Sequence, residues 1–173
     1  MSTDLKILQI NLNCSALATE SALQYSIENK IDIIIVQEPW LVRPSQGLDY
    51  KNTRSVVHQG FIQLIPNTEL RPRTLAYIAR NSNFNTSISS ISPKDPDLLI
   101  LDITSGNFDF QLVNIYNEAD QEKIGPKTLE RVLYPISNSL QSNLLVLGDF
   151  NLHHAWWDPL TNTTTPGSKE FID

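Results

Sequence analysis

With 173 residues, 40% of them hydrophobic and 18% charged, the chain is long enough for one domain with a sizeable core but too short for two uncrowded ones. Its longest apolar run, around Ile33 to Val36, is far shorter than the roughly 20 residues that a membrane helix needs, and its first residues lack the regions of a signal peptide, so we expect a soluble intracellular protein, nuclear or cytoplasmic, that does not bind membranes. The net charge of -6 argues against strong non-specific attraction to polyanions.

The N-terminal part predicts a strand, a helix and a second strand. The mixed residue content of Leu5–Asn11 is typical of a central strand covered on both faces. Good helix formers follow from Ala16 to Asn29, where Leu23 and Ile27 would share one buried face. The β-branched run Ile31–Gln37 is the second strand. A right-handed crossover would make the two strands parallel.

The middle of the chain predicts a long loop followed by several short strands. Pro39–Arg54 is polar and contains prolines and a glycine, which is typical of a loop. Thr104–Asn107 is rich in turn formers and would join the last two strands in a hairpin, with Asp109 and Gln111 on one wet face. The predicted strands are Phe61–Ile65, Leu75–Ala79, Ser87–Ile91, Leu98–Ile103 and Phe108–Ile115.

A second helix and a last strand complete the pattern. Apolar residues spaced by three and four predict the helix, and Pro135 should kink or split it because an interior proline costs about 3 kcal/mol. Asn143–Gly148 is then a buried strand that ends at Asp149. This order of elements indicates an α/β protein with mixed sheets and helices outside them. The apolar positions of the helix are Leu129, Val132, Leu133, Ile136 and Leu140.

Basic residues concentrate between Leu41 and Ser90. Six basic side chains against two acidic ones give this segment a net charge of +4, whereas the rest of the chain has -10. Because five of the six are arginines, the segment is the best candidate for a surface that faces phosphate. We expect Arg71, Arg73 and Arg80 to bind nucleic acid. Any one of them alone is more simply explained as part of an ordinary solvated surface.

Polar side chains follow four of the predicted strands. All of them offer oxygen ligands or hydrogen-bonding groups, and hard oxygen donors favour magnesium or manganese over zinc or copper. Each has a structural explanation when it is taken alone, since Gly, Asp and Asn are common turn formers and a tyrosine often lies at the edge of a core. The residues are Asn11, Gln37, Glu38, Asn114, Tyr116, Asn117, Asp149 and Asn151.

Taken together, four motifs resemble the endonuclease/exonuclease/phosphatase superfamily in their order and spacing. They are Gln9-Ile10-Asn11, Ile35-Val36-Gln37-Glu38-Pro39, Val113-Asn114-Ile115-Tyr116-Asn117 and Leu147-Gly148-Asp149-Phe150-Asn151. The continuation Leu152-His153-His154-Ala155-Trp156-Trp157 and the stretch Arg73–Ile78 look most like the endonuclease domains of non-LTR retrotransposons. The resemblance implies a four-layer α/β sandwich, with two mixed β-sheets flanked by helices, that acts on DNA as a metal-dependent phosphodiesterase.

The resemblance also implies a role for each site residue. Glu38 would hold a divalent cation, Mg²⁺ or Mn²⁺, and Asn11 would steady that carboxylate or a metal-bound water. Asp149 would orient and help deprotonate the attacking water. Asn151 would donate a hydrogen bond to the phosphate oxygens, and Tyr116 would contact the scissile phosphate.

In one respect the sequence departs from the superfamily's pattern, because the Ser-Asp-His type segment expected near the C-terminus is absent. We therefore expect residues 1–173 to form a single domain that is incomplete at its C-terminus, lacks the last part of the second sheet, and is weakly active or inactive. His154 fits a structural or phosphate-contacting place. An exposed sheet edge would favour a homodimer or strand exchange.

Three other functions are weighed against a DNA-nicking endonuclease. The first is a non-catalytic, retroelement-derived protein that binds a protein or nucleic acid, and the second keeps the fold but takes a small phosphomonoester or a lipid phosphate. The third, a cysteine protease, is rejected because Cys14 lacks a flanking signature and a lone cysteine is more often a small buried hydrophobe. Zinc binding by the adjacent His153 and His154 is also rejected, because neighbouring side chains on an extended strand point in opposite directions.

Overall fold

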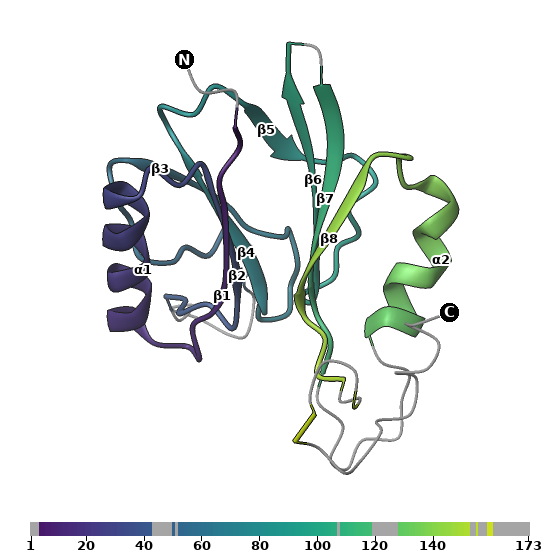
Figure 1. Cartoon of the computed structure of the whole chain (residues 1–173). Helices are drawn as coiled ribbons and strands as arrows, with labels where there is room; N and C mark the ends of the chain where they lie inside the picture. Colours follow the sequence, from purple (N-terminus) through teal and green to yellow (C-terminus); the bar gives the residue numbers. More distant parts are fainter. Residues whose placement is uncertain are drawn as a thin grey trace.

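Two four-stranded sheets face each other in the computed structural model, which describes residues 4–42, 50, 52–106, 108–118, 128–152, 155, 159 and 160 (Figure 1). The first sheet has the order β1-β2-β4-β3 and consists of β1 (Ile7–Asn11), β2 (Ile33–Gln37), β4 (Thr74–Ala79) and β3 (Phe61–Leu64). The second has the order β5-β6-β7-β8 and consists of β5 (Asn85–Ile88), β6 (Leu98–Ser105), β7 (Phe108–Tyr116) and β8 (Leu144–Asp149). Both sheets are mixed, because β1 is parallel to β2 and β7 is parallel to β8, while the other pairs are antiparallel.

Helices cover the outer faces of both sheets, so the predicted four-layer sandwich is confirmed (Figure 1). α1 (Ala16–Glu28) packs on the first sheet. On the second lies a helical segment made of η1 (Leu129–Leu133), α2 (Tyr134–Ile136) and η2 (Ser137–Ser139). The apolar core between the sheets joins β2 and β4 to β6 and β7. Within the described residues, no helix is long and apolar enough to cross a membrane.

The first strand lies at an edge of its sheet, and the prediction of a central strand is therefore wrong. Its coverage on both faces is nevertheless real, since Leu8 and Ile10 pack under α1 while Ile7 packs into the core between the sheets. β1 also contacts β8 of the second sheet. Burial on two faces does not distinguish an edge strand from a central one when helices and a second sheet cover both sides.

The helix α1 buries a different stripe from the one predicted. Ile27 is 43% exposed, whereas Thr19, Ala22, Leu23 and Ser26 are buried. The two hydroxyls lose no hydrogen bonds on burial, because Thr19 Oγ1 donates to Ser15 O at 2.7 Å and Ser26 Oγ donates to Ala22 O at 2.7 Å. Small side chains with internally satisfied hydroxyls therefore face the sheet.

The predicted second helix is a continuous run of helical turns whose hydrogen-bonding pattern changes next to Pro135. A π-helical turn, a short α-helical turn and a 3₁₀ turn follow one another, and Pro135 lies in the α-helical part. The backbone dihedral angles of Leu133 and Tyr134 are helical, so the segment is not split at the proline. The apolar face built from Leu129, Val132 and Leu133 still packs on the second sheet.

The hairpin of β6 and β7 is confirmed, with Ser105 paired to Phe108, but of its predicted wet face only Asp109 is exposed. Gln111 is only 3% exposed, because η2 and the residues after it cover that face. Its side chain donates to Asp102 Oδ1 at 2.8 Å and accepts from Gln141 N at 2.8 Å. The alternation of polar and apolar residues predicted that Gln111 would face solvent, whereas in the structure its side-chain amide is buried and hydrogen-bonded.

Candidate active site

The parallel strand pairs of both sheets end at the same end of the sandwich. β1 and β2 end with Asn11 paired to Gln37, and β7 and β8 end with Tyr116 paired to Asp149. β8 contacts both β1 and β2, so these ends lie together (Figure 1). The structure thus brings Asn11, Glu38, Tyr116 and Asp149 to one rim, although they are distant in sequence.

Asn11 joins the two carboxylates of this rim. Its Nδ2 donates to Asp149 Oδ2 at 3.0 Å and to Glu38 Oε1 at 3.3 Å. Its Oδ1 accepts from the backbone N–H of Asn13 at 2.9 Å, which turns the nitrogen towards the acids. Because both carboxylate oxygens bind the same nitrogen, Glu38 Oε1 and Asp149 Oδ2 lie close together.

Glu38 is held in a tight turn after β2. Its φ of 48° is unusual for a residue with a side chain, and three backbone hydrogen bonds maintain it. Glu38 N donates to Arg73 O at 2.9 Å, Cys14 N donates to Glu38 O at 2.8 Å, and Leu12 N donates to Gln37 O at 2.9 Å. Cys14, expected to be a small buried hydrophobe, is exposed in this neighbouring turn. Cys14 contributes to the turn through its backbone N–H, which bonds to Glu38 O.

Asp149 and Asn151 lie in a second tight turn, braced by Asn117. Asn117 N donates to Asp149 O at 2.7 Å, and the buried Asn117 side chain donates to Phe150 O at 2.8 Å. Asn151 N donates to Asp149 Oδ1 at 3.2 Å, and Asn151 Nδ2 donates to Asn117 O at 2.7 Å. Both oxygens of Asp149 are therefore oriented, one by Asn11 and one by the backbone of Asn151.

Tyr116 contacts the guanidinium of Arg73, and the charges of Glu38, Arg73 and Asp149 act on its hydroxyl. Burial raises the pKa of Tyr116 to about 12, and the hydrogen bond and charge of Glu38 and the charge of Asp149 add to the effect, while the charge of Arg73 opposes it. Near pH 7 the phenol consequently keeps its proton. The Arg73 Cζ atom lies 4.9 Å from the centre of the Tyr116 ring.

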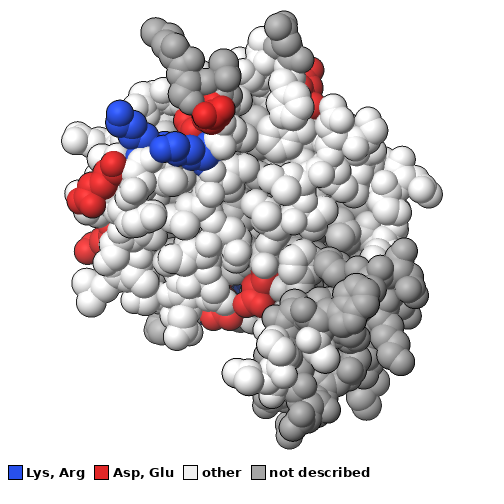
Figure 2. Space-filling view, viewed as in Figure 1, with Lys and Arg blue, Asp and Glu red and all other residues white. Residues whose placement is uncertain are grey.

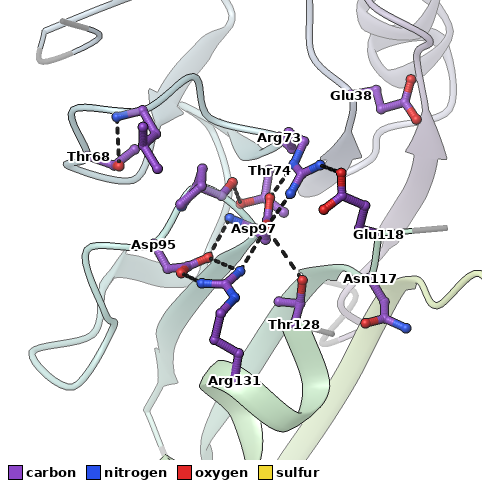
Figure 3. Close-up of polar contacts among 12 residues, drawn as sticks. Glu38, Thr68, Arg73, Thr74, Asp95, Asp97, Asn117, Glu118, Thr128 and Arg131 are labelled. Atoms are coloured by element: carbon purple, nitrogen blue, oxygen red, sulfur yellow. Dashed lines mark hydrogen bonds and ion pairs between the residues drawn. The ribbon is translucent and has the colours of Figure 1, made fainter. Parts of the chain in front are cut away.

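The side chain of Arg73 is occupied by acidic partners. Nε and Nη2 contact the two carboxylate oxygens of Asp97 at 2.5 and 2.6 Å, and Nη1 contacts Glu118 Oε1 at 3.1 Å (Figure 3). Burial acts to lower the pKa of Arg73, but hydrogen bonding and charge from Asp97, and then from Glu118, raise it above its ordinary value. Sequence reasoning missed these partners, although Asp97 directly precedes β6 just as Arg73 directly precedes β4.

The other predicted nucleic-acid-binding residues lie in different places. Arg71 is exposed, and its Nη2 contacts Pro39 O at 3.4 Å, beside Glu38. Arg80 follows the other end of β4, roughly 20 Å from Arg73 at about 3.3 Å per strand residue, so the structure does not bring it to the rim. His154 lies outside the described residues, as do His153, Trp156 and Trp157.

Acidic atoms lie at two places on the face drawn in Figure 2. Some lie in the upper half, beside the basic atoms at the upper left, and others form a separate group near the lower edge, where β2 and β8 end. Within the described part of the chain, no group of three or more His, Cys, Asp or Glu side chains forms a metal-binding cluster. The rim instead offers two carboxylates, amides and a phenol, which are oxygen ligands and hydrogen-bond donors of the hard type.

Buried amides connect the two sheets beneath the rim. Gln9 Nε2 donates to Gln37 Oε1 at 2.6 Å, and Gln37 Nε2 donates to Asn114 Oδ1 at 2.7 Å. Asn114 Nδ2 then reaches across to Val36 O and Leu75 O at 3.1 and 3.0 Å. Gln37 and Asn114 are both fully buried. These two residues, which the sequence placed among polar strand ends, hold the sheets in register under the site.

Comparison with known proteins identifies the architecture. No protein-family model matches the sequence, and no curated protein matches it. Among solved structures, the endonuclease domain of TRAS1, a telomere-specific non-LTR retrotransposon, superposes with a TM-score of 0.71 and 15% sequence identity, covering 98% of this chain and 68% of that one. The chain has the endonuclease/exonuclease/phosphatase fold.

Two further solved structures share this endonuclease/exonuclease/phosphatase fold. A D. rerio TDP2 complexed with a single-strand DNA product has a TM-score of 0.56 and 17% identity, covering 96% of this chain and 68% of that one. A humanized D. rerio TDP2 has a TM-score of 0.54 and 16% identity, covering 96% and 69%. At these identities the likeness is one of fold, and this is the fold that the resemblance of the four short motifs implied.

Proposed function

We propose that the chain is a divalent-metal-dependent phosphodiesterase domain that nicks DNA weakly. One observation carries the proposal: a single amide, that of Asn11, joins the carboxylates of Glu38 and Asp149 at the rim of the sandwich. Similarity in fold to a retrotransposon endonuclease domain and to TDP2 supports a nuclease-type activity. The DNA product bound by one of those TDP2 structures makes DNA a reasonable substrate class.

A phosphodiester is an anion, so hydrolysis needs positive charge at the phosphoryl oxygens and a base for the attacking water. The rim fits a hard divalent cation, because carboxylate oxygens are the ligands that such a cation prefers. The carboxylates of Glu38 and Asp149 converge on the neutral amide of Asn11 and not on a basic side chain. Glu38, with Asn11, would hold Mg²⁺ or Mn²⁺, which when bound neutralises the developing charge on the phosphate.

The protein's own groups divide the remaining work. Asp149, with both oxygens oriented, accepts the proton of the attacking water. Asn151 donates to the phosphate oxygens through its side-chain amide. Tyr116 contacts the scissile phosphate as a protonated phenol, since its pKa of about 12 keeps it neutral near pH 7. Arg71 is exposed beside the rim and gives a phosphate contact, and His154 stays a predicted contact.

Nicking of supercoiled plasmid tests the proposal. Wild-type protein in Mg²⁺ should convert supercoiled DNA to the open-circular form, and EDTA should stop the conversion. Asp149→Ala should lose the activity, because the base is removed, by about 10²-fold or more. Equal nicking by wild-type protein and Asp149→Ala would show that a contaminating nuclease is responsible and would refute the proposal.

A non-catalytic, retroelement-derived binding protein is the alternative, and one observation favours it. Within the described residues the only histidine, His58, is far from the rim, at the start of β3, where its Nδ1 accepts from Gly60 N at 3.0 Å and its ring packs on Phe61. The described part of the site thus has no imidazole to act as a base. DNA binding without nicking, in Mg²⁺ or Mn²⁺, would support this alternative.

A further inference from the structure

Two positions that precede antiparallel strands hold the backbone of the site. Arg73, just before β4, accepts from Glu38 N at 2.9 Å through its carbonyl oxygen. Asp97, just before β6, accepts from Tyr116 N at 2.8 Å through its carbonyl oxygen. Because the side chains of Arg73 and Asp97 are bonded to each other, and the guanidinium of Arg73 lies over the ring of Tyr116, one ion pair links the backbone contacts of Glu38 and Tyr116.

Asp97 is a rigid anchor for Arg73. It is 1% exposed, and its carboxylate also accepts from Arg131 Nη2 at 3.0 Å, on η1, and from Thr128 Oγ1 at 3.4 Å (Figure 3). Asp95 completes the cluster, since it pairs with Arg131 and its Oδ1 accepts from Asp97 N at 2.9 Å. The helical segment and both sheets therefore meet at one buried carboxylate.

All three nitrogens of the Arg73 guanidinium have carboxylate partners, two from Asp97 and one from Glu118. The cluster contains two cations, Arg73 and Arg131, and three anions, Asp95, Asp97 and Glu118, so it presents little net attraction to a phosphate. The guanidinium lies over the Tyr116 ring, with Cζ 4.9 Å from the ring centre. A planar guanidinium that is fixed by a bidentate contact restricts the position of the aromatic ring beside it, whereas the flexible ammonium of a lysine does not.

We propose that Arg73 is the positioning residue of Tyr116, fixing the plane of the ring and the direction of its hydroxyl, and is not a contact to DNA phosphate. This deepens the proposed function and rests on it for the role of Tyr116.

Kinetics of Arg73→Met and Arg73→Lys in the full chain separate positioning from phosphate binding. Positioning predicts that kcat for nicking falls by about 10- to 100-fold while KM for DNA is unchanged. Arg73→Lys should be nearly as slow, because an ammonium cannot make the two-pronged contact. In a Tyr116→Phe background, Arg73→Met should cause almost no further loss. Additive losses, or a change confined to KM, would overturn the inference.

The salt dependence of DNA binding gives a second arm that needs no turnover. Each lost phosphate contact lowers the slope of log K against log salt by about 0.9. Positioning predicts an unchanged slope for Arg73→Met, relative to wild type and to the matched control Lys30→Met, whose exposed side chain lies at the other end of the first sheet. A slope lower by about one unit would assign Arg73 to phosphate binding and end the proposal.

NMR of the Arg73 Nε–H group tests the packing itself. We expect a protected signal with a ring-current shift that Tyr116→Phe retains and Tyr116→Leu removes. This arm does not need any Arg73 variant to fold, and an unshifted, rapidly exchanging signal would refute the proposal. If wild-type protein shows this signal but nicks no DNA, the proposed function fails while the placement of Arg73 stands. If the wild-type protein nicks DNA but lacks the signal, the proposed function stands and the placement of Arg73 fails.

Discussion

Asn11 is placed so that one side-chain amide contacts both acids of the site. Its oxygen is engaged by Asn13 N, so the donor cannot rotate away without losing that bond. The turns at Glu38 and Asn151 both have φ near +48°, which neighbouring backbone hydrogen bonds maintain. At the scale of single residues, the site is built from short polar side chains held by strained turns, so its geometry is set before a substrate arrives.

Tyr116 provides a pH prediction. A tyrosine ordinarily titrates near pH 10, whereas the pKa of Tyr116 is raised to about 12 by burial and by Glu38. The folded state therefore binds its proton more tightly than the unfolded state does. The stability that this contributes is complete below about pH 10 and is lost as the pH rises through about 12.

The measurement is the phenolate absorbance near 295 nm in an alkaline titration. The difference between wild-type protein and Tyr116→Phe should show one phenol that ionises near pH 12. Tyr25, which is 53% exposed on α1, supplies the matched control in Tyr25→Phe. If the phenol that Tyr116→Phe removes titrates near pH 10 in the wild-type protein, the burial of Tyr116 and the effect of Glu38 on its pKa are contradicted.

At the scale of elements, the site depends on how closely β7 and β8 approach each other. Gly148 precedes Asp149, and a Cβ atom added to it would lie 2.0 Å from Ile115 O. Gly148→Ala should therefore push β8 away from β7 and lower the free energy of unfolding by about 3 kcal/mol or more. Gly106→Ala is the matched control, because Gly106 also has positive φ but has no atom within 4 Å of the added Cβ; it should cost only about 1 kcal/mol.

Urea denaturation followed by circular dichroism measures both variants. Equal losses for the two glycine positions would mean that positive φ alone, and not the close approach of β7 and β8, makes Gly148 necessary. A Gly148 variant that folds should also lose nicking, since Asp149 would move with the strand.

The sequence predicted the elements and their order well, because hydrophobic period and turn chemistry are local properties. It also predicted which residues end the parallel strands, and the candidate site lies at those strand ends. It failed where the answer depended on a distant partner. Gln111 is buried because residues after η2 cover it, and Arg73 is paired because Asp97 lies beside it across the sandwich. Neither contact has a local signal.

For the whole molecule, the important feature is that each sheet supplies half of the site. Asn11 and Glu38 follow strands of the first sheet, and Tyr116 and Asp149 belong to strands of the second. The buried amides of Gln37 and Asn114 bridge the same two sheets directly beneath. The site is therefore sensitive to any shift of one sheet relative to the other.

A cation held between the sheets should stabilise the whole sandwich. Glu38 and Asp149 repel each other when no cation lies between them, and a ligand that binds only the folded state adds RT ln(1 + [L]/Kd) to its stability. At a Mg²⁺ concentration ten times Kd this is about 1.4 kcal/mol, which should raise Tm by roughly 3 to 6 °C for a chain of this size. Differential scanning calorimetry with Mg²⁺ and with EDTA measures the shift. It should disappear in Glu38→Gln and persist in Glu20→Gln, whose side chain is exposed on α1. An equal shift in both variants would place the cation elsewhere on the molecule.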